Sequence, residues 1–222
     1  MLLTPLLALF APHDCVGCGA EGLLLCYQCQ SHMYPPTPRC YSCLIKSSGW
    51  DTCKLCRPTS PLSRAQAVVR YEGAAKDLVW KLKFGRARDG AREIGQLLAA
   101  GAQVSFDHNL VAVSVPTAPV RVRQRGYDQA ALIAKAFAVE AGLPYAALLR
   151  RSGSQKQVGS NKAQRLQQIQ HAYRPVKRTH IQGATILLID DVLTTGATLE
   201  SCARVLLEAG ARRVEALVFA QA

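Results

Sequence analysis

The distribution of apolar residues along the chain predicts alternating strands and helices. Strands are expected at five places, namely 65–71, 110–115, 147–149, 186–189 and 212–219. The runs at 110–115 and 186–189 are continuously apolar, which is typical of strands buried on both faces of a parallel sheet. Helices are expected where the apolar period lengthens, namely 74–84, 88–100, 130–141 and 199–209. Because the two kinds of element alternate, the sequence predicts an α/β fold in which helices flank a parallel sheet.

The helix expected at 74–84 has one apolar side and one lysine-rich side. Leu78 and Leu82, with Trp80, are expected to point inward. The remaining face is then assigned to solvent, and it carries three lysines: Lys76, Lys81 and Lys83.

The strand expected at 186–189 is followed at once by polar chemistry. Asp190 and Asp191 stand at its carboxyl end. A small, hydroxyl-bearing segment then leads into the next helix: Thr194, Thr195, Gly196, Ala197 and Thr198. Backbone N–H groups converge at such a helix N-terminus and favour a phosphate, and glycine lets the backbone approach the anion closely. The segment is therefore a candidate phosphate cradle.

The adjacent carboxylates need a different ligand, since they would repel a phosphate. Asp190 and Asp191 can each accept a hydrogen bond from a sugar hydroxyl. A ribose that carries a 5-phosphate satisfies both halves of the site. The alternative is an ordinary strand–turn–helix with a capping threonine and a solvated acidic pair.

Basic residues are concentrated in one part of the 222-residue chain, whose formal net charge is +12. Between Ala118 and Arg178 there are twelve basic residues against the two acids Asp128 and Glu140. Such a field attracts polyanions and phosphorylated metabolites alike. Three of these bases lie in the loop expected after the strand at 110–115: Arg121, Arg123 and Arg125. If that strand neighbours 186–189, the loop faces the cradle and suits a diphosphate on the same sugar; the alternative is a solvated basic loop.

Eight of the nine cysteines form four Cys-x-x-Cys pairs. The pairs are Cys15/Cys18, Cys26/Cys29, Cys40/Cys43 and Cys53/Cys56. Each pair can present two thiolates to one tetrahedral ion, so the sequence predicts two structural zinc ions rather than disulfides or one redox centre. Sequential grouping of the pairs is favoured over interleaved grouping, because the second half of the block resembles a repeat of the first. The ninth cysteine, Cys202, is expected to be a core residue.

The chain length and a segment of turn-forming residues suggest two structural units. A turn-rich segment at 58–61 marks a linker, so the expected division is 1–60 for the cysteine-rich unit and 61–222 for the α/β unit. No apolar run approaches the ~20 residues needed to cross a membrane. The apolar N-terminus lacks the basic start and cleavage site of a signal peptide, so a cytoplasmic location is expected.

Two motifs together carry a family resemblance. The run 186–198 resembles the phosphoribosyl-pyrophosphate (PRPP) motif of type I phosphoribosyltransferases. With the four Cys-x-x-Cys pairs and the segment 125–129 (Arg-Gly-Tyr-Asp-Gln), the chain resembles the ComF/GntX family, which joins a double zinc ribbon to such a domain. Further matching positions are Gln157, Arg165, Ala172 and Tyr173, whereas Asp128 and Gln168 stand where the family usually has asparagine.

The resemblance implies a function as well as a fold. Asp190 and Asp191 would hold the ribose hydroxyls as the catalytic pair, 194–198 the 5-phosphate, and Mg2+ would accompany the diphosphate of PRPP. Residues 150–163 would correspond to a flexible hood. The family is also linked to natural transformation, which implies handling of single-stranded DNA with a helicase-like partner. The alternatives are transfer to an unidentified small acceptor, and a GntX-like role in carbon utilisation.

Single-stranded nucleic acid usually stacks its bases on aromatic side chains beside a basic groove. The sequence offers five candidates near the charge: Tyr27, Tyr34, Tyr41, Trp50 and Tyr127.

Overall fold

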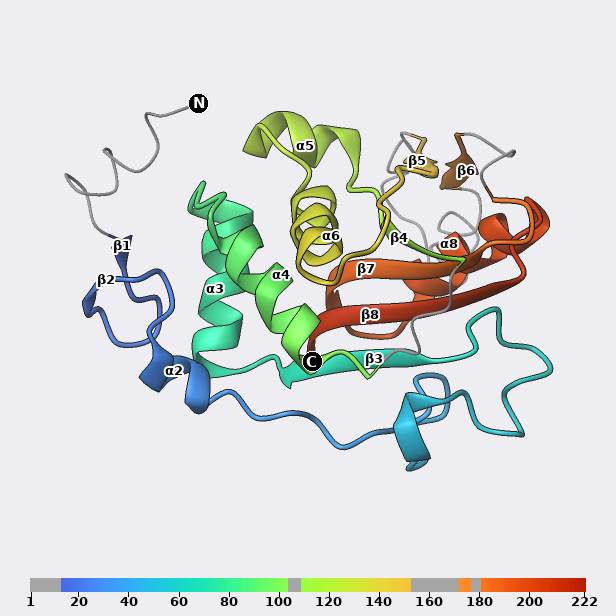
Figure 1. The fold of residues 1–222 in the computed structure, drawn as a ribbon, viewed down its shortest axis with the longest axis horizontal. Helices are drawn as coiled ribbons and strands as arrows, with labels where there is room; N and C mark the ends of the chain where they lie inside the picture. The colour runs from blue at the N-terminus through green and yellow to red at the C-terminus, as the bar shows by residue number, and fades with distance from the viewer. Residues whose placement is uncertain (1–12, 104–108, 153–171, 177–180) are drawn as a thin grey trace, which may run out of the picture.

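A four-stranded parallel sheet forms the centre of the molecule (Figure 1). The computed structural model describes residues 13–103, 109–152, 172–176 and 181–222. The sheet consists of β3 (Ala65–Arg70), β4 (Leu110–Ser114), β7 (Thr185–Leu193) and β8 (Arg213–Gln221) in the order β3-β8-β7-β4. Leu188 lies in register with Val113 of β4 on one side and with Ala216 of β8 on the other. The predicted α/β fold is confirmed, and so is the expectation that β4 and β7 are neighbours.

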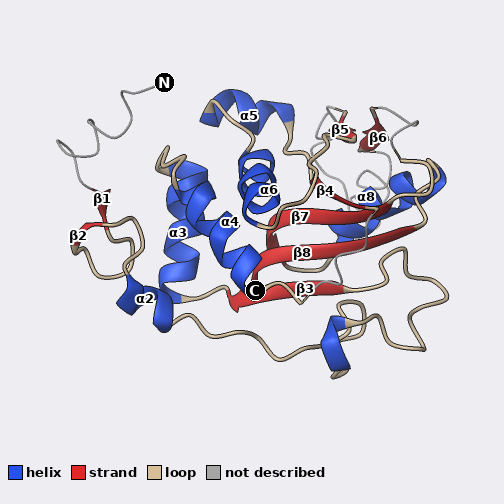
Figure 2. Cartoon of the chain, in the orientation of Figure 1, coloured by secondary structure: helices blue, strands red, loops and turns tan. Residues whose placement is uncertain are grey.

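Helices cover both faces of the sheet (Figure 2). One face packs against α3 (Gly73–Phe84), α4 (Gly90–Gly101) and α6 (Gln129–Glu140), and the other against α8 (Ala197–Glu208). Alternation along β7 explains the division: Leu187 and Ile189 are buried on the three-helix face, and Ile186 and Leu188 on the α8 face. A strand that buries both faces must be apolar throughout, as the sequence indicated.

Three local expectations need correction. The segment with Arg121, Arg123 and Arg125 is a helix, α5 (Pro119–Arg125), rather than a loop, because Pro119 fits the first turn of a helix and Gly126 ends it with φ of 80°. Trp80 is 54% exposed and does not point inward. The short strand expected at 147–149 lies instead at β5 (Leu149–Arg151), antiparallel to β6 (Tyr173–Pro175), so the first two residues of the expected hood belong to a strand.

The cysteine-rich part consists of two small units, which we define as the first cysteine unit (13–33) and the second cysteine unit (38–60). The first contains β1 (His13–Asp14), β2 (Glu21–Gly22) and α2 (Tyr27–Ser31), and the second contains the 3-10 helix η1 (Ser48–Trp50). The first unit lies beyond α3 and the second beside β3 (Figure 1). The division at residue 60 remains a prediction. Within the described ranges, none of the helices has the length and apolar character that a membrane span requires.

The two units contribute to different cores. Leu24 and Leu25 of the first unit are buried with the α3, α4 and α6 side chains. Tyr41 and Trp50 of the second unit are buried with the α8 side chains. Each unit is thus continuous with the core on one face of the sheet.

Candidate functional site

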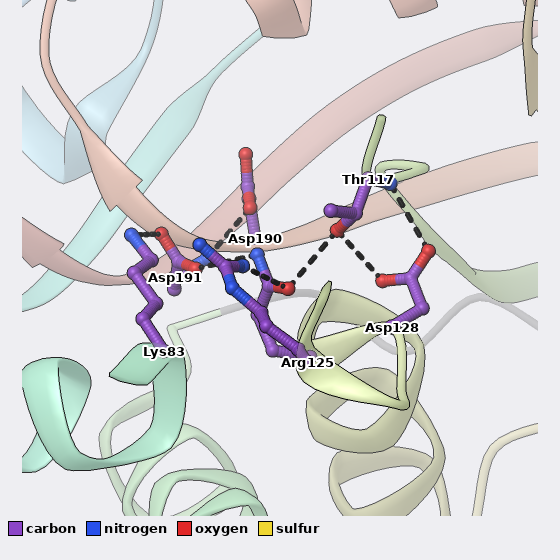
Figure 3. A network of polar contacts seen from close by, with 7 residues as sticks. Lys83, Thr117, Arg125, Asp128, Asp190 and Asp191 are labelled. Atoms are coloured by element: carbon purple, nitrogen blue, oxygen red, sulfur yellow. Dashed lines mark hydrogen bonds and ion pairs between the residues drawn. The ribbon is translucent and has the colours of Figure 1, made fainter. Parts of the chain in front are cut away.

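The acidic pair lies within β7 rather than after it. The strand extends to Leu193, and Asp190 and Val192 are in register with Val218 and Ala220 of β8. Because successive residues of a strand point to opposite faces, Asp190 shares the face of α8, and Asp191 shares the face of α3 and α6. Figure 3 shows the two carboxylates pointing in different directions from the strand.

Asp191 is the centre of a polar network that includes a lysine from α3 (Figure 3). Lys83 Nζ donates to Asp191 Oδ1 over 2.6 Å, and Gln129 Nε2 donates to Asp191 Oδ2 over 3.3 Å. Arg125 Nη1 in turn donates to Gln129 Oε1 over 2.6 Å. The expectation that Lys83 faces solvent was therefore wrong. The sequence carried no signal for this, since spacing on a helix says which side a residue occupies but not that the helix end reaches another strand.

Asp190 is half-buried and close to a second negative charge. Burial, with the adjacent charge of Asp191, raises the pKa of the Asp190 carboxyl well above its usual value. The backbone N–H of Asp191 donates to Asp190 Oδ1 over 2.9 Å and offsets part of this effect. A group that donates a hydrogen bond to this carboxylate, such as a sugar hydroxyl, would stabilise its charged form.

The segment 194–198 forms the turn into α8. Gly196 is the residue before the helix and has φ of 76°, a left-handed conformation that favours glycine. Within the described residues, no side chain caps this end of α8, whereas Asp128 caps α6 by accepting from the backbone N–H of Ala131 over 3.2 Å. The first intrahelical bond is from Glu200 N to Gly196 O, 2.9 Å. The backbone N–H groups of the first turn are therefore available to an anion.

A cationic cleft lies next to the acidic pair. It has a volume of about 570 Å³ and is lined by Tyr71, Lys83, Phe84, Arg86, Arg121, Gln124, Arg125 and Tyr127. Arg121 and Arg125 enter it together because residues four apart share a side of a helix, whereas Arg123 is exposed and is not among the lining residues. Burial and the neighbouring charge of Arg121 lower the pKa of Arg125. Crowded guanidinium groups of this kind favour an anion between them.

Asp128 has a structural role in the turn between β4 and α6. Besides capping α6, its carboxylate accepts from Thr117 N over 3.0 Å and from Thr117 Oγ1 over 2.9 Å. Both contacts involve donors, so a carboxylate serves here in place of the amide that the family usually has.

The eight paired cysteines gather into two clusters in sequential order. One cluster contains Cys15, Cys18, Cys26 and Cys29, and the other Cys40, Cys43, Cys53 and Cys56; the sulfur atoms of each lie within 4.8 Å of one another. The Sγ atoms of Cys18 and Cys26 are 3.7 Å apart, and those of Cys43 and Cys53 are 3.6 Å apart. A tetrahedral zinc with Zn–S bonds of about 2.3 Å separates its sulfur ligands by about 3.8 Å. The clusters therefore have the dimensions of four-cysteine metal sites.

Hydrogen bonds from the backbone favour the thiolate form of one cysteine in each cluster, whereas the hydrogen bond to the Cys26 side chain raises the pKa of Cys29. Burial alone would raise the pKa of Cys15, but N–H groups of Cys26, Cys18 and Gly17 point at its sulfur and lower the pKa to about 6. Cys40 is similar: N–H groups of its own cluster outweigh burial and lower its pKa to about 6. Metal binding requires thiolates, which this arrangement favours.

The residues predicted for the site do not all lie together. The structure brings together Asp191, Arg121 and Arg125, with 194–198 at the end of the same strand, but leaves Arg123 outside the cleft. Lys83 and Gln129 were missed as site residues. Ala172 and Tyr173 are buried, whereas Gln157, Arg165, Gln168 and the hood beyond Ser152 lie outside the described residues.

Comparisons with known proteins identify the domain type and the relatives of this chain. The phosphoribosyl transferase domain family matches residues 122–222. The chain is 30% identical over 199 residues to competence protein ComFC of Bacillus subtilis, covering 84% of this chain and 79% of that protein. It is 26% identical over 210 residues to DNA utilization protein YhgH of Salmonella typhimurium, covering 90% of this chain and 86% of that protein.

A solved structure of glutamine PRPP amidotransferase from Bacillus subtilis aligns with a TM-score of 0.42 and 22% identity over 59% of this chain, and this chain spans only 26% of that one. The alignments with the two curated relatives, by contrast, cover 84% and 90% of this chain. The chain therefore belongs to the ComF family of ComFC and YhgH proteins, as its motifs predicted.

Proposed function

We propose that this protein binds PRPP at the carboxyl end of β7. The main supporting observation is that an uncapped helix N-terminus follows directly after two carboxylates on one strand. Backbone N–H groups at Thr194, Thr195, Gly196, Ala197 and Thr198 hold the 5-phosphate in this proposal, with the three threonine hydroxyls as further donors. Asp190 and Asp191 accept from the ribose hydroxyls.

The diphosphate of PRPP would lie against the cationic cleft. Lys83 and Arg125 meet at the Asp191 network, and Arg121 lines the same cleft, so three cations surround the expected position of the leaving group. Once ribose hydroxyls donate to Asp191, Lys83 can turn to diphosphate oxygens. Mg2+ bound to the diphosphate and ribose oxygens would neutralise further charge, and the neighbouring carboxylates are the oxygen donors that this ion prefers.

The corresponding chemistry is phosphoribosyl transfer. The bond from C1 of the ribose to the diphosphate oxygen breaks, pyrophosphate leaves with the electron pair, and a nucleophile bonds to C1. Lys83, Arg121 and Arg125 stabilise the negative charge that develops on the leaving group. The acceptor is not identified by any described side chain, so we propose PRPP binding as the primary function and transfer to a small acceptor as the alternative.

The two cysteine clusters are proposed as structural zinc sites. Their cysteines supply all four positions of a tetrahedral ion, which leaves no open position for a substrate. Units of this size bury few apolar residues, so the metal would supply much of their folding free energy.

We further propose that the protein handles single-stranded DNA in the cytoplasm with a helicase-like partner, as the competence and DNA utilization names of its relatives suggest. The cleft supports this because it joins cations to exposed aromatic rings. Phe84 is 63% exposed, its ring lies 5.9 Å from that of Trp80, and the Arg125 guanidinium lies 5.4 Å from it. Bases stack on such rings while cations follow the phosphates. A role in carbon utilisation is the remaining alternative.

The aromatic candidates offered by the sequence are mostly unsuitable for stacking. Tyr41, Trp50 and Tyr127 are buried, whereas Tyr27 of the first cysteine unit and Tyr34, which follows that unit, are exposed. Trp80 was assigned to the core, and Phe84 was not singled out. Lys177 and Arg178, at the end of the basic region, lie outside the described residues, so the cleft is the better target.

PRPP binding is tested by calorimetry with Mg2+ present. The double substitution of Asp190→Asn and Asp191→Asn preserves shape and removes both charges, and should weaken PRPP binding by about tenfold or more, since each charge-assisted bond contributes about 1.5–3 kcal/mol. Asp77→Asn is the matched control, because it is an exposed acid on α3. Unchanged PRPP affinity in the double variant would show that the ribose assignment is wrong.

DNA binding is tested with an oligothymidylate at two salt concentrations. Stacking should quench the fluorescence of the wild type, and Trp80→Phe should abolish the quenching, since Trp50 is buried. Each neutralised phosphate should contribute about −0.7 to the slope of log affinity against log salt. Arg121→Ala should lower that slope more than Arg123→Ala on the same helix. No binding at low salt, or equal effects of the two arginines, would remove the cleft as the DNA site.

A further inference from the structure

A tyrosine of the second cysteine unit lies against the turn 194–198, which we call the phosphate turn because it is proposed to hold the 5-phosphate. Tyr41 follows Cys40 in the sequence and is 5% exposed, in one core with Leu193 and Leu199. A Cβ atom placed on Gly196 would lie 2.9 Å from Cδ2 of the Tyr41 ring. Two features therefore favour glycine at position 196: its φ of 76°, and the Tyr41 ring, which leaves no room for a Cβ atom.

The hydroxyl of Tyr41 connects the same turn to the end of the second unit. It donates to Glu200 Oε1 over 3.1 Å, and it is also hydrogen bonded to Ser60 Oγ. Glu200 belongs to the first turn of α8, whose N–H groups form the proposed cradle. Ser60 Oγ accepts from Leu62 N over 3.2 Å, which fixes its position. The ring thus covers the turn, while the hydroxyl holds the first turn of the helix.

The backbone of Tyr41 is itself fixed by the second cluster. Cys40, a cysteine of the second cluster, donates from its N–H to Ile45 O over 2.9 Å, so Tyr41 lies inside a turn that begins at a proposed metal ligand. Leu44 N also donates to Cys40 O over 2.8 Å, which closes this turn. If the metal left, the turn that carries the ring would lose its central support.

The first unit has no equivalent contact. Tyr27 likewise follows a cysteine of its cluster, Cys26, but its side chain is 82% exposed. Tyr41 follows the first cysteine of its cluster and Tyr27 follows the third, so a tyrosine after a cluster cysteine is not by itself enough to bury the ring.

We propose that Tyr41 is a positioning residue through which metal occupancy of the second cluster sets the affinity of 194–198 for a sugar 5-phosphate. The proposal rests on the proposed function, in which this segment holds the 5-phosphate. A turn held in its binding conformation binds more tightly, because less order must be imposed on binding. Linkage is reciprocal, so a bound 5-phosphate must also retain the metal of the second cluster, and only that one.

Affinity for ribose 5-phosphate tests the first half of the linkage by calorimetry. This probe carries the 5-phosphate and hydroxyls without the diphosphate, so it reports on the cradle alone. Tyr41→Ala should weaken binding by about tenfold, and Tyr41→Phe, which keeps the ring but removes the hydroxyl bonds, by about threefold, the range expected when one net hydrogen bond is lost. Tyr27→Ala should leave the affinity unchanged.

The cysteine variants test the second half without relying on Tyr41. Cys43→Ser and Cys18→Ser remove equivalent exposed ligands from the two clusters. Cys43→Ser should weaken ribose 5-phosphate binding, and Cys18→Ser should not. In the zinc-loaded wild type, ribose 5-phosphate should slow chelator-driven release of one of the two metal equivalents, and this protection should be lost in Tyr41→Ala.

The possible results separate the two proposals. If the wild type does not bind ribose 5-phosphate or PRPP, the proposed function fails and the linkage with it. If the wild type binds but Tyr41→Ala, Tyr41→Phe and Cys43→Ser bind equally well, the positioning role is overturned while the function stands. Equal losses in Cys43→Ser and Cys18→Ser would indicate a general loss of folding, and would also overturn the specific linkage.

Discussion

The two cysteine units have similar sequences and different surroundings. Each presents four cysteines of similar spacing, one deeply buried and one exposed at the equivalent position. The first unit packs through Leu24 and Leu25 into the core beneath α3 and α4, and the second packs through Tyr41 and Trp50 into the core beneath α8. The two units therefore lie on opposite faces of one sheet, and the acidic pair divides between the same two faces.

A repeated cysteine motif therefore packs against two unlike parts of the candidate site. Gly17 of the first unit lies close to Ala74 at the start of α3, the helix whose last turn carries Lys83. Tyr41 of the second unit lies against Gly196 at the start of α8. The first unit thus packs against the helix that carries Lys83, and the second packs against the turn that we propose to hold the 5-phosphate.

Metal removal should have the largest effect and should affect both units. Structural zinc contributes about 10–16 kcal/mol to the folding of small metal-binding units, so a strong chelator should unfold residues 13–60. The purified protein should contain about two equivalents of zinc, and Cys15→Ser and Cys40→Ser should each lower this by one. Cys202→Ser is the control, because Cys202 is buried in the α8 core and belongs to neither cluster. Metal analysis near zero, or equal loss in the control, would contradict the assignment.

Truncation of Leu24 should separate the stability of the first unit from ligand binding. Leu24→Ala removes a side chain that is 6% exposed and packs near Gly90, and should lower the free energy of unfolding by about 2–5 kcal/mol. Ribose 5-phosphate affinity should stay at the wild-type level, since this contact lies on the face opposite α8. Leu23→Ala, at a neighbouring residue that is 47% exposed, is the matched control. A loss of phosphate affinity in Leu24→Ala would show that the two units are not independent.

Much of this arrangement could be predicted from sequence because it depends on local patterns. Continuous apolar runs identified β4 and β7, Cys-x-x-Cys spacing identified the cysteines of the two clusters, and the repeat within the block favoured their sequential order. The phosphate turn was predictable because small residues, glycine and the start of a helix are adjacent in the chain. Each of these features is determined by residues that lie close together in the sequence.

The features that were missed depend on contacts between distant segments. Lys83 is 108 positions from Asp191, and a helical pattern alone assigned it to solvent. Tyr41 is 159 positions from Glu200 and was considered only as an aromatic near charge. The basic segment was expected to be a loop because α5 is short and buries no side chain, so its sequence has no apolar face that would indicate a helix. Tertiary packing decides such positions, so no local period reveals them.

Substitutions of Lys83 and of Tyr41 should affect the binding of different parts of the ligand. Lys83→Met keeps the length of the side chain and removes the cation, and should weaken PRPP binding by about tenfold while leaving ribose 5-phosphate affinity nearly unchanged, since one charge-assisted bond is lost on the diphosphate side. Tyr41→Ala should instead weaken the binding of both ligands. Lys81→Met, at an exposed position on the same helix, is the control. Equal losses of both ligands in Lys83→Met would place Lys83 at the sugar rather than at the diphosphate.

The two carboxylates should differ in a smaller effect, the pH dependence of stability. Burial and the charge of Asp191 raise the pKa of Asp190 in the folded protein, so the folded state binds more protons than the unfolded state above the ordinary value of 3.8. Stability from this group is therefore fully present below that value and is lost as pH rises toward the raised pKa, by about 1.4 kcal/mol for each pH unit between the two pKa values.

Asp190→Asn removes the ionisation, so its free energy of unfolding should exceed that of the wild type at pH 7, and the difference should shrink as pH falls toward 4. Asp191→Asn should lower stability at pH 7 instead, because it leaves Lys83 without its carboxylate partner. Denaturant unfolding at several pH values measures both, and a pH-independent difference for Asp190→Asn would show that its carboxyl titrates normally in the folded protein.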